Sequence, residues 1–235
     1  MLIVLSLCAA GSAFGAISVG SGGSFSLGDG GLDLAGGDLT VDGQFDVANG
    51  SVSNAGNVQI GGTLDGGNGS LSLLGDWINN GVFNAGLGQV SFIDDAGTSA
   101  QIVGNSTFYG LFFLSSAGGA YVLQTGTVQR VINSLVIQGN GAPVQIESSI
   151  PPQIAELLLE PGGSQNITNV GVSNVHATGQ PLAPNQTNQG GSGNARGWFG
   201  LPIDPLPVPV LSIPGLVILM LAVLGVAYAR CGGIA

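Results

Sequence analysis

The sequence predicts an all-β protein: a parallel β-helix, or β-solenoid, of about 19–20 residues per coil, flanked by an N-terminal signal helix and a C-terminal transmembrane helix. Three observations support this prediction. Glycine is abundant, at 43 of 235 residues, while charged residues make up only 7%. Apolar residues recur at nearly every sixth or seventh position between Leu32 and Val90. Long apolar segments stand at both ends of the chain.

The N-terminal segment from Met1 to Ala16 has the layout of a secretory signal peptide, an apolar stretch followed by small residues. Ala13 and Gly15 form a small-x-small site, so we expect cleavage directly before Ala16. The segment is too short to span a membrane. Cys8 loosely matches a lipoprotein signal, but the bulky Leu7 before it favours ordinary cleavage. Residues 1–15 are therefore predicted to be removed after passage through the secretion translocon.

Residues 16–200 are predicted to form the β-helix, because their apolar residues fall into three columns when grouped in threes. The columns are Leu32, Val52, Leu71 and Val90; Leu39, Val58 and Trp77; and Phe25, Phe45, Leu64 and Phe83. Polar residues alternate with apolar ones at these steps, and Gly and Asn occupy the corners, where positive φ is accessible to them. Three short faces per coil, stacked about 4.8 Å apart, explain both features. A hairpin meander or a flexible linker would not keep the columns in register.

Composition excludes several functional classes. The formal net charge is −10, from 13 acidic and 3 basic residues. Arg130 and Arg196 lie far apart, so no basic cluster exists to neutralise phosphates, and nucleic-acid binding is excluded. A hydrophobic content of 44% argues against disorder. No cysteine stands between Cys8 and Cys231, which excludes a disulfide framework or a cysteine metal site there.

Residues that could carry chemistry are few. His176 is the one histidine, and no nucleophile-elbow motif accompanies it. The pairs Asp33/Asp38 and Asp42/Asp46 could align as a calcium ladder, since hard cations take several oxygen ligands. Half of the aspartates, however, stand directly beside glycine, where they favour turns. We therefore predict solvated turn aspartates, with no catalytic residue, no cofactor and no metal site.

Part of the β-helix, roughly Leu71 to Phe199, resembles a module of large secreted bacterial surface proteins. The resemblance rests on motifs in a fixed order: Gly75, Trp77, Asn79-Asn80-Gly81, Phe83, Ala85-Gly86, Val90 and Phe92, then Thr107-Phe108-Tyr109 and Leu111, then Ser134-Leu135-Val136-Ile137-Gln138-Gly139. It implies an adhesin-like or extracellular-matrix solenoid without catalysis. Residues 180–200, which are polar and rich in Gly and Asn, are expected to cap the last coil.

The C-terminal segment divides into a Pro-rich spacer and sorting motif at residues 201–212, a transmembrane helix at residues 213–230 and a cytoplasmic tail at residues 231–235. The apolar run is long enough for about 17 helical residues, near the lower limit for a membrane span. Arg230 follows it directly, which fits a cytoplasmic end under the positive-inside rule.

This layout resembles the bacterial C-terminal sorting signals of the IPTL-CTERM and PEP-CTERM type. The resemblance rests on Pro209-Val210-Leu211-Ser212 and Gly215, followed by the apolar helix and Arg230. It implies that an exosortase-like transpeptidase in the inner membrane processes the precursor. A plain membrane anchor without processing is the alternative.

Two functional classes remain open from the sequence. The first is a non-enzymatic surface or extracellular-matrix protein that passes through the inner membrane as a precursor. The second is a carbohydrate-binding or weakly carbohydrate-active β-helix, with an extracellular polysaccharide as its partner. A groove lined with exposed aromatics and paired carboxylates would favour the second class. Trp77 and Phe83 stand in the apolar columns, where a core position is expected instead.

Overall fold

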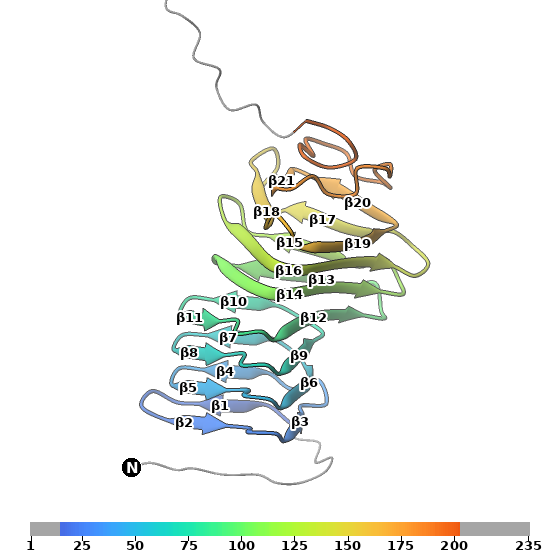
Figure 1. Ribbon diagram of the computed structural model, residues 1–235. Coiled ribbons are helices and arrows are strands. Elements are labelled where there is room, and N and C mark those ends of the chain that lie inside the picture. Colours follow the sequence, from blue (N-terminus) through green and yellow to red (C-terminus); the bar gives the residue numbers. More distant parts are fainter. Residues whose placement is uncertain (1–14, 203–235) are drawn as a thin grey trace, which may run out of the picture. The chain divides into compact units, whose positions relative to one another are not determined.

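The computed structural model describes residues 15–202, which form a stack of parallel strands (Figure 1). The predicted signal segment up to Phe14 and the predicted transmembrane helix lie outside the described residues, as does the sorting motif. Within residues 15–202 the chain is all-β and contains no helix. Residues 15–202 accordingly include no apolar helix long enough to cross a membrane.

The fold is a β-solenoid, as the sequence predicts, and it has about eight turns. Every strand pairing is parallel, and the pairings form an eight-stranded, a nine-stranded and a four-stranded sheet. The strands are β1 Ile17–Val19, β2 Ser24–Ser26, β3 Gly31–Asp33, β4 Leu39–Val41, β5 Gln44–Asp46, β6 Ser51–Ala55, β7 Val58–Ile60, β8 Thr63–Asp65, β9 Ser70–Leu73, β10 Trp77–Asn79, β11 Val82–Asn84, β12 Gln89–Asp94, β13 Ser99–Val103, β14 Ser106–Ser115, β15 Ala120–Leu123, β16 Val128–Gly139, β17 Val144–Ser148, β18 Ala155–Leu159, β19 Ser164–Thr168, β20 Val170–Ser173 and β21 Val175–Gly179.

The strand register confirms the three predicted columns. Leu39 pairs with Val58 and Val58 with Trp77, and all three side chains are fully buried. Leu32, Val52, Leu71 and Val90 are successive partners in the nine-stranded sheet, and Phe25, Phe45, Leu64 and Phe83 in the four-stranded sheet. Partners in these coils stand 19 or 20 residues apart. Each coil therefore positions the apolar residues of the next.

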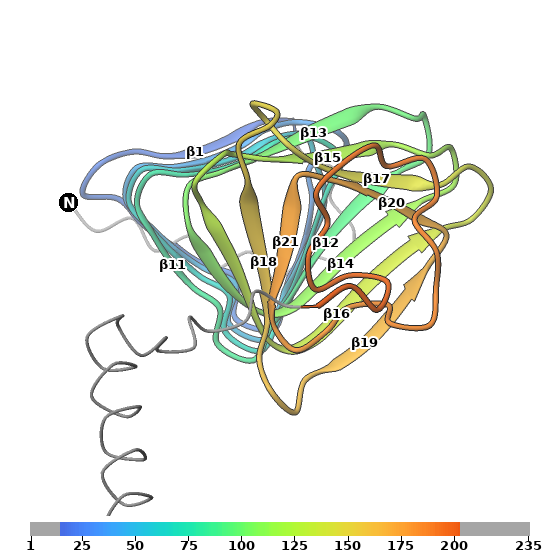
Figure 2. The ribbon, with the colours of Figure 1, turned by 90° about the horizontal axis from the view of Figure 1, so that it is seen from above.

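The coils change shape after β11, where the four-stranded sheet ends. In the first four coils the chain turns outward to form a third face, built from β2, β5, β8 and β11. In the next two coils β14 and β16 run as single long strands past that position (Figure 2). Contacts between neighbouring coils then join residues 20 to 30 apart, so the period loosens as the sequence predicts.

Aromatic side chains fill the interior where the cross-section changes. Trp77 and Phe83 pack edge to face with ring centroids 4.9 Å apart, and Phe108 from β14 lies 5.4 Å from Trp77. Trp77 also donates its Nε1–H to Ser106 Oγ at 3.0 Å. Phe92, Phe113 and Tyr121 form a second cluster with centroids 4.6–5.7 Å apart. Trp77 is therefore a core residue, as expected.

The last coil is covered by residues 180–200, consistent with the predicted cap. Trp198 is fully buried, and its backbone forms a parallel bridge with Leu182. The cap also pairs with the top strand, because Ala177 N–H donates to Arg196 C=O at 2.8 Å. The upper apolar columns thus end beneath a folded segment of the same chain.

Val58→Asp should destabilise the protein far more than Asp46→Asn. Val58 lies between Leu39 and Trp77 in the core, where a new carboxylate would have no partner. Asp46 accepts hydrogen bonds from Ala48 N–H and Ser26 Oγ near the surface; an asparagine can accept the first with its oxygen and donate its amide N–H to Ser26 Oγ in place of the second. We expect a change within about 0.5 kcal/mol for Asp46→Asn and a loss above about 3 kcal/mol for Val58→Asp. Urea unfolding followed by circular dichroism measures both, and equal midpoints would contradict the core position of Val58.

Candidate functional site

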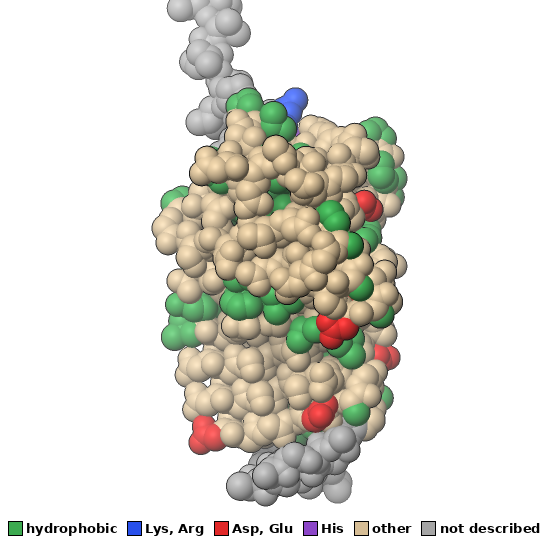
Figure 3. Space-filling view, turned by 90° about the vertical axis from the view of Figure 1, so that its right-hand side faces the viewer, with side chains coloured by type: hydrophobic (Ala, Val, Ile, Leu, Met, Phe, Trp, Pro, Cys, Tyr) green, Lys and Arg blue, Asp and Glu red, His purple; other side chains and the backbone are tan. Residues whose placement is uncertain are grey.

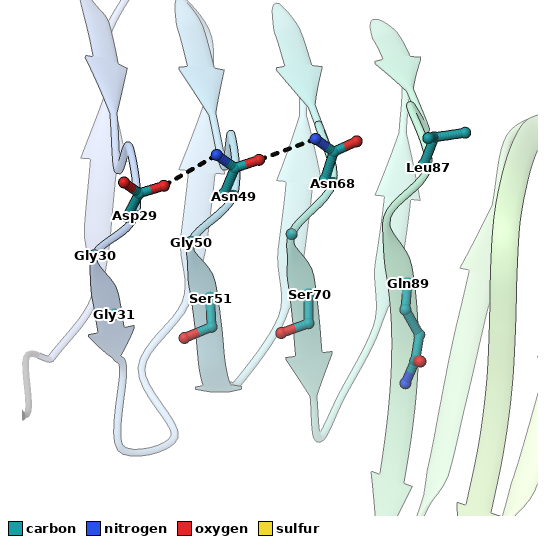
Figure 4. A pocket seen from close by; sticks show the side chains of 11 residues that line it. Asp29, Gly30, Gly31, Asn49, Gly50, Ser51, Asn68, Ser70, Leu87 and Gln89 are labelled. Atoms are coloured by element: carbon teal, nitrogen blue, oxygen red, sulfur yellow. Dashed lines mark hydrogen bonds between the residues drawn. The ribbon is translucent and has the colours of Figure 1, made fainter.

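The most regular surface feature is a shallow groove of about 420 Å³ that crosses the first four coils (Figure 4). We call it the polar groove. It is lined by Asp29, Gly30, Gly31, Asn49, Gly50, Ser51, Asn68, Gly69, Ser70, Leu87 and Gln89. These residues belong to the corners that lead from the four-stranded sheet into β3, β6, β9 and β12. The groove therefore consists of one corner repeated in four coils.

The same tight turn forms this corner in every coil. Its closing hydrogen bond runs from the N–H of Gly30, Gly50, Gly69 or Gly88 to the carbonyl three residues earlier, at 2.8–3.1 Å. The residue after that carbonyl has positive φ in each case, as at Gly67 (56°) and Gly86 (57°). The next residue does not have positive φ, which distinguishes this type II′ turn from a type I′ turn, and glycine adopts the positive φ without steric cost. The next residue, at position 29, 49, 68 or 87, carries the side chain that projects into the groove.

Side chains at this position form a hydrogen-bonded ladder along the stack. Asn49 Nδ2 donates to Asp29 Oδ1 at 2.9 Å, and Asn68 Nδ2 donates to Asn49 Oδ1 at 2.9 Å (Figure 4). Each asparagine uses one amide hydrogen and at most one oxygen lone pair for this ladder. A primary amide has two donors and an oxygen with two lone pairs, so each retains hydrogen-bonding capacity toward the solvent.

Close stacking of the corners explains why the groove has glycine in its floor. A Cβ on Gly50 would lie 2.3 Å from the Gly30 carbonyl oxygen in the coil below. No side chain fits there without separating the coils. The hydroxyl-bearing Ser51 and Ser70 follow the glycines and also line the groove. The result is an extended surface of amides, hydroxyls and backbone.

The lining of the polar groove is made of amides, hydroxyls and backbone groups, with a single carboxylate. Asp29 is the one acidic residue among its lining side chains, and no aromatic residue lines it. Glycoside hydrolysis by the common mechanisms needs two carboxylates that flank the scissile bond. A row of amide groups can instead exchange hydrogen bonds with a hydroxyl-rich or otherwise polar extended ligand.

The aspartates considered as a calcium ladder serve mainly as hydrogen-bond acceptors in the stack. Asp33 accepts hydrogen bonds from Asn54 Nδ2 and from Ala35 N–H, and these two bonds lower the pKa of Asp33. Asp38 accepts from the backbone and side chain of Asn57. Asp42 is exposed, and Asp46 bonds Ser26 and Ala48. Among the residues described, no three His, Cys, Asp or Glu side chains gather in a way that could hold a metal ion.

His176 lies in β21 and is buried, and its Nε2 has no hydrogen-bond partner within residues 15–202. Its partner across the sheet is Glu156 of β18. Neither residue lines the polar groove. Of the predicted cleavage residues, Gly15 and Ala16 are exposed and directly precede β1, whereas Ala13 lies outside the described residues. Pro209, Val210, Leu211, Ser212, Gly215 and Arg230 also lie outside them.

Asp94 is a buried carboxylate that organises the turn after β12. Burial favours its neutral form, but hydrogen bonds from Thr98 N–H, Ser115 Oγ, Thr98 Oγ1 and Ala96 N–H outweigh it and hold the pKa of Asp94 below its ordinary value. Tyr121 lies nearby, and its pKa is raised by burial and by the charges of Asp94 and Asp95. This cluster is a structural feature, because all these donors are used to fix the turn.

The sequence does not predict the polar groove; it predicts only that glycine and asparagine, such as Asn49-Gly50, occupy corners. The usable signal was the spacing of Asp29-Gly30, Asn49-Gly50 and Asn68-Gly69, which recur once per coil. Comparison of the chain with protein-family models, curated proteins and solved structures finds no match. Function is therefore inferred from the sequence and the geometry of this chain.

Asp94→Asn should reduce stability at neutral pH by about 1–3 kcal/mol, because several donors lose a charged acceptor. The native pKa lies below the unfolded value of about 3.9, so the contribution of the carboxylate is present above that pH. It is lost as the pH falls through the native pKa. The difference between parent and variant should therefore shrink in acid, as measured by urea unfolding at neutral pH and near pH 2.

The matched control is Asp95→Asn. Asp95 is exposed and accepts one hydrogen bond, from Ser116 Oγ. Its substitution should change stability by less than about 0.5 kcal/mol at either pH. An Asp94→Asn deficit that stayed constant from neutral pH to acid would show that the charge of Asp94 does not stabilise the turn.

Proposed function

We propose that this chain is an exported, non-enzymatic surface or extracellular-matrix protein of the adhesin-like type. The observation that carries the proposal is the polar groove, a repeated surface of amides and hydroxyls with one carboxylate in its lining. Such a surface suits attachment to an extended polar partner. It does not supply the pair of acid and base groups that bond cleavage requires.

The construction of the solenoid also supports a structural role. Its coils are joined by parallel backbone pairing and by side-chain ladders such as Asp38–Asn57, and they depend on no disulfide in residues 15–202. Repeat proteins of this kind present long regular surfaces, because each unit offers the same groups as its neighbour. A matrix or surface protein needs such a surface more than it needs a single enclosed pocket.

Export and sorting complete the proposal. The N-terminal segment has the layout of a signal peptide with cleavage before Ala16, and the C-terminal segment resembles an IPTL- or PEP-type sorting signal around Pro209 to Ser212. In this proposal the precursor is held in the inner membrane, an exosortase-like transpeptidase processes it, and the mature protein reaches the cell surface or matrix. A plain membrane anchor is the competing interpretation of the same segment.

The polar groove also favours a second candidate function, the binding of an extracellular polysaccharide. Asn49 and Asn68 repeat at the coil spacing of about 4.8 Å along one line, and both keep unused hydrogen-bonding capacity. A hydroxyl-rich chain laid along that line could meet an amide at successive coils. No aromatic residue lines the groove to stack against sugar rings, so weak, multivalent binding is expected.

Asn49→Ala combined with Asn68→Ala should weaken binding to polysaccharide from the native host by about tenfold or more, because two of the repeated amides are removed. Sedimentation of the protein with insoluble polysaccharide measures the bound fraction. Asn84→Ala is the matched control: Asn84 donates to Asp65 in the same way but lies outside the groove. Equal loss in both variants, or none in either, would contradict a role of the groove.

Replacing Pro209-Val210-Leu211-Ser212 with Gly and Ser residues separates sorting from plain anchoring. The apolar run from Ile213 onward stays intact, so membrane insertion is preserved. If the motif directs processing, the variant should accumulate uncut in the inner membrane while the parent is cleaved. Intact-mass spectrometry of protein from membrane and surface fractions reports both processing events. A variant processed and located like the parent would leave only the anchor interpretation.

A further inference from the structure

The lower end of the solenoid is a coil with no strand beneath it in the part of the chain that the structure describes (Figure 1). β1, β2 and β3 are the terminal strands of the three sheets, and each has its one strand partner in the coil above. The upper end differs, because residues 180–200 cover it. We call residues 17–33, which hold β1, β2, β3 and the two corners between them, the base coil. The base coil leaves three strand edges open.

The open edges direct backbone groups away from the stack. The N–H groups of Ile17, Leu27 and Leu34 each donate to a carbonyl oxygen of the coil above, at 2.8–2.9 Å. Successive residues of a strand direct their N–H and C=O groups to opposite sides. By this alternation, the outward-facing residues of the three strands present their N–H and C=O groups at the lower end: Ser18, Ser24, Ser26, Gly31 and Asp33.

The apolar core also ends at the base coil. Phe25 is partly buried and stacks on the fully buried Phe45 above it, with ring centroids 5.2 Å apart. Ile17 is likewise partly buried, although its partner Leu39 in the next coil is fully buried. A second apolar surface below Ile17 and Phe25 would complete their burial.

We propose that two copies of the mature chain pair base to base, across a two-fold axis that passes through Phe25 at right angles to the solenoid axis. β2 then pairs with β2 of the second copy, antiparallel, and β1 of each copy pairs with β3 of the other. Ser24 and Ser26 of opposite copies exchange N–H···O=C hydrogen bonds, and the two Phe25 side chains meet inside the joined core. Each solenoid lies wholly on its own side of the contact, so the two bodies do not overlap.

The helical path of the coil fits this axis. A two-fold axis at right angles to a helix maps the path of the helix onto itself, so the two base coils meet along their whole circumference. Equivalent residues of the first two coils stand 20 residues apart, so the half coil that precedes Phe25 begins close to Ala16. Any residue that continued the coil before Ala16 would overlap with the second copy. The pairing therefore rests on the proposed cleavage directly before Ala16.

The base coil is nearly symmetric about Phe25, as this axis requires. Three-residue strands, β1 and β3, flank β2 on its two sides. The corner on either side is closed by a hydrogen bond to the carbonyl three residues back, from Gly23 N–H to Gly20 C=O and from Gly30 N–H to Leu27 C=O. Each corner of one copy therefore faces a corner of the same span in the other.

Charge also favours this axis in a chain whose net charge is −10. The acidic residues of the base coil are Asp29 and Asp33. In the pair, Asp29 faces residues 20–23 of the second copy and Asp33 faces its β1, and neither segment holds a charged residue. An axis through β3 would instead bring Asp33 of both copies together on one strand pair, where like charges repel. Acidic side chains are also scattered along the flank of the stack, which disfavours a side-by-side contact (Figure 3).

β11, the last strand of the four-stranded sheet, also has an open edge. It borders a cleft of about 500 Å³ between β11 and the first residues of β14 and β16. The upper coils continue the stack directly behind this cleft, so the body of a second copy paired there would overlap with them (Figures 1 and 2). The base coil is therefore the edge at which two solenoids fit. Because residues 180–200 cover the opposite end, the contact gives a dimer instead of a longer stack.

Intact-mass spectrometry and sedimentation equilibrium of the protein from its native host, in density-matched detergent, test the proposal. The protein should begin at Ala16 and be dimeric. A protein that begins at Ala16 and is monomeric would overturn the pairing and leave the export proposal standing. A protein that keeps the residues before Ala16 would overturn both, because those residues block the contact.

Ser18→Pro tests the pairing of β1. The Ser18 N–H points to the lower end and has no acceptor within residues 15–202, so proline removes a bond of the interface and none of the coil, as edge strands tolerate. The dimer dissociation constant should rise by about tenfold or more, since two equivalent sites each lose a hydrogen bond. Ser18→Ala keeps the N–H and is the matched control, with a change of less than about threefold. Equal effects of the two substitutions would contradict the pairing.

Disulfide trapping gives an independent measurement of the axis. Ser24 of one copy stands opposite Ser26 of the other in a hydrogen-bonded pair, with Cα atoms about 5.5 Å apart, a distance that a disulfide spans. Ser24→Cys with Ser26→Cys should therefore give a covalent dimer on oxidation. The background is Cys231→Ser, and Cys8 is removed by the proposed cleavage.

The matched control for trapping is Gln44→Cys with Asp46→Cys in the same background. These residues occupy the equivalent positions of β5, which has a strand on each side. Gln44→Cys with Asp46→Cys should give no covalent dimer. Equal yields of dimer from the two pairs would show random collision and refute the axis through Phe25.

Discussion

In-register parallel stacking is the constraint on which the rest of this structure depends. Each coil receives backbone hydrogen bonds from the coil below, so it must repeat that coil's strand positions and corners. Corners approach so closely that a Cβ at Gly43 or Gly62 would lie 2.3 Å or 2.1 Å from a carbonyl oxygen of the coil below. The abundance of glycine is therefore a requirement of stacking, and it makes the apolar columns possible because the coils can meet face to face.

Polar side chains are subject to the same repetition. Stacking places equivalent residues directly above one another, which would bring like charges together in a chain with many aspartates. Asparagine resolves this conflict, because one amide can both donate and accept along a ladder. Asp38 accepts from Asn57, which in turn accepts from Asp76 N–H. The polar groove is the same device at another corner, which suggests that its regularity arises first from the stack and is then available for binding.

Function in such a protein follows from what the coils expose. The lower four coils offer one corner repeated without interruption, while the change of path at β14 ends that repetition and leaves β11 as the last strand of the four-stranded sheet. The polar groove of the lower coils and the cleft beside β11 share no lining residue.

The sequence by itself determined the solenoid and the members of its columns. Apolar residues must point inward in every coil, so Leu39, Val58 and Trp77 could be assigned to one column from spacing alone. The sequence is a weaker guide from β14 onward, where one long strand runs past the position of the third face. The run from Tyr109 to Leu114 predicts a strand, but nothing local specifies that the strand extends over Ser106–Ser115 and bypasses the third face. That path depends on Phe108 packing against Trp77 and Phe83, two side chains from the preceding coil.

The same distinction holds for the candidate sites. Asp29, Asn49 and Asn68 are visible in the sequence as corner residues, and their spacing is that of the coil. Only the tertiary structure aligns their side chains into one ladder and leaves the groove beside it open. The edge of β11 is likewise open because the next coil has no strand that continues the four-stranded sheet. Whether a side chain points inward or outward follows from the local alternation of residues along a strand. A groove or an open edge, by contrast, exists only in relation to neighbouring coils. For that reason the tertiary structure alone decided the groove and the edge.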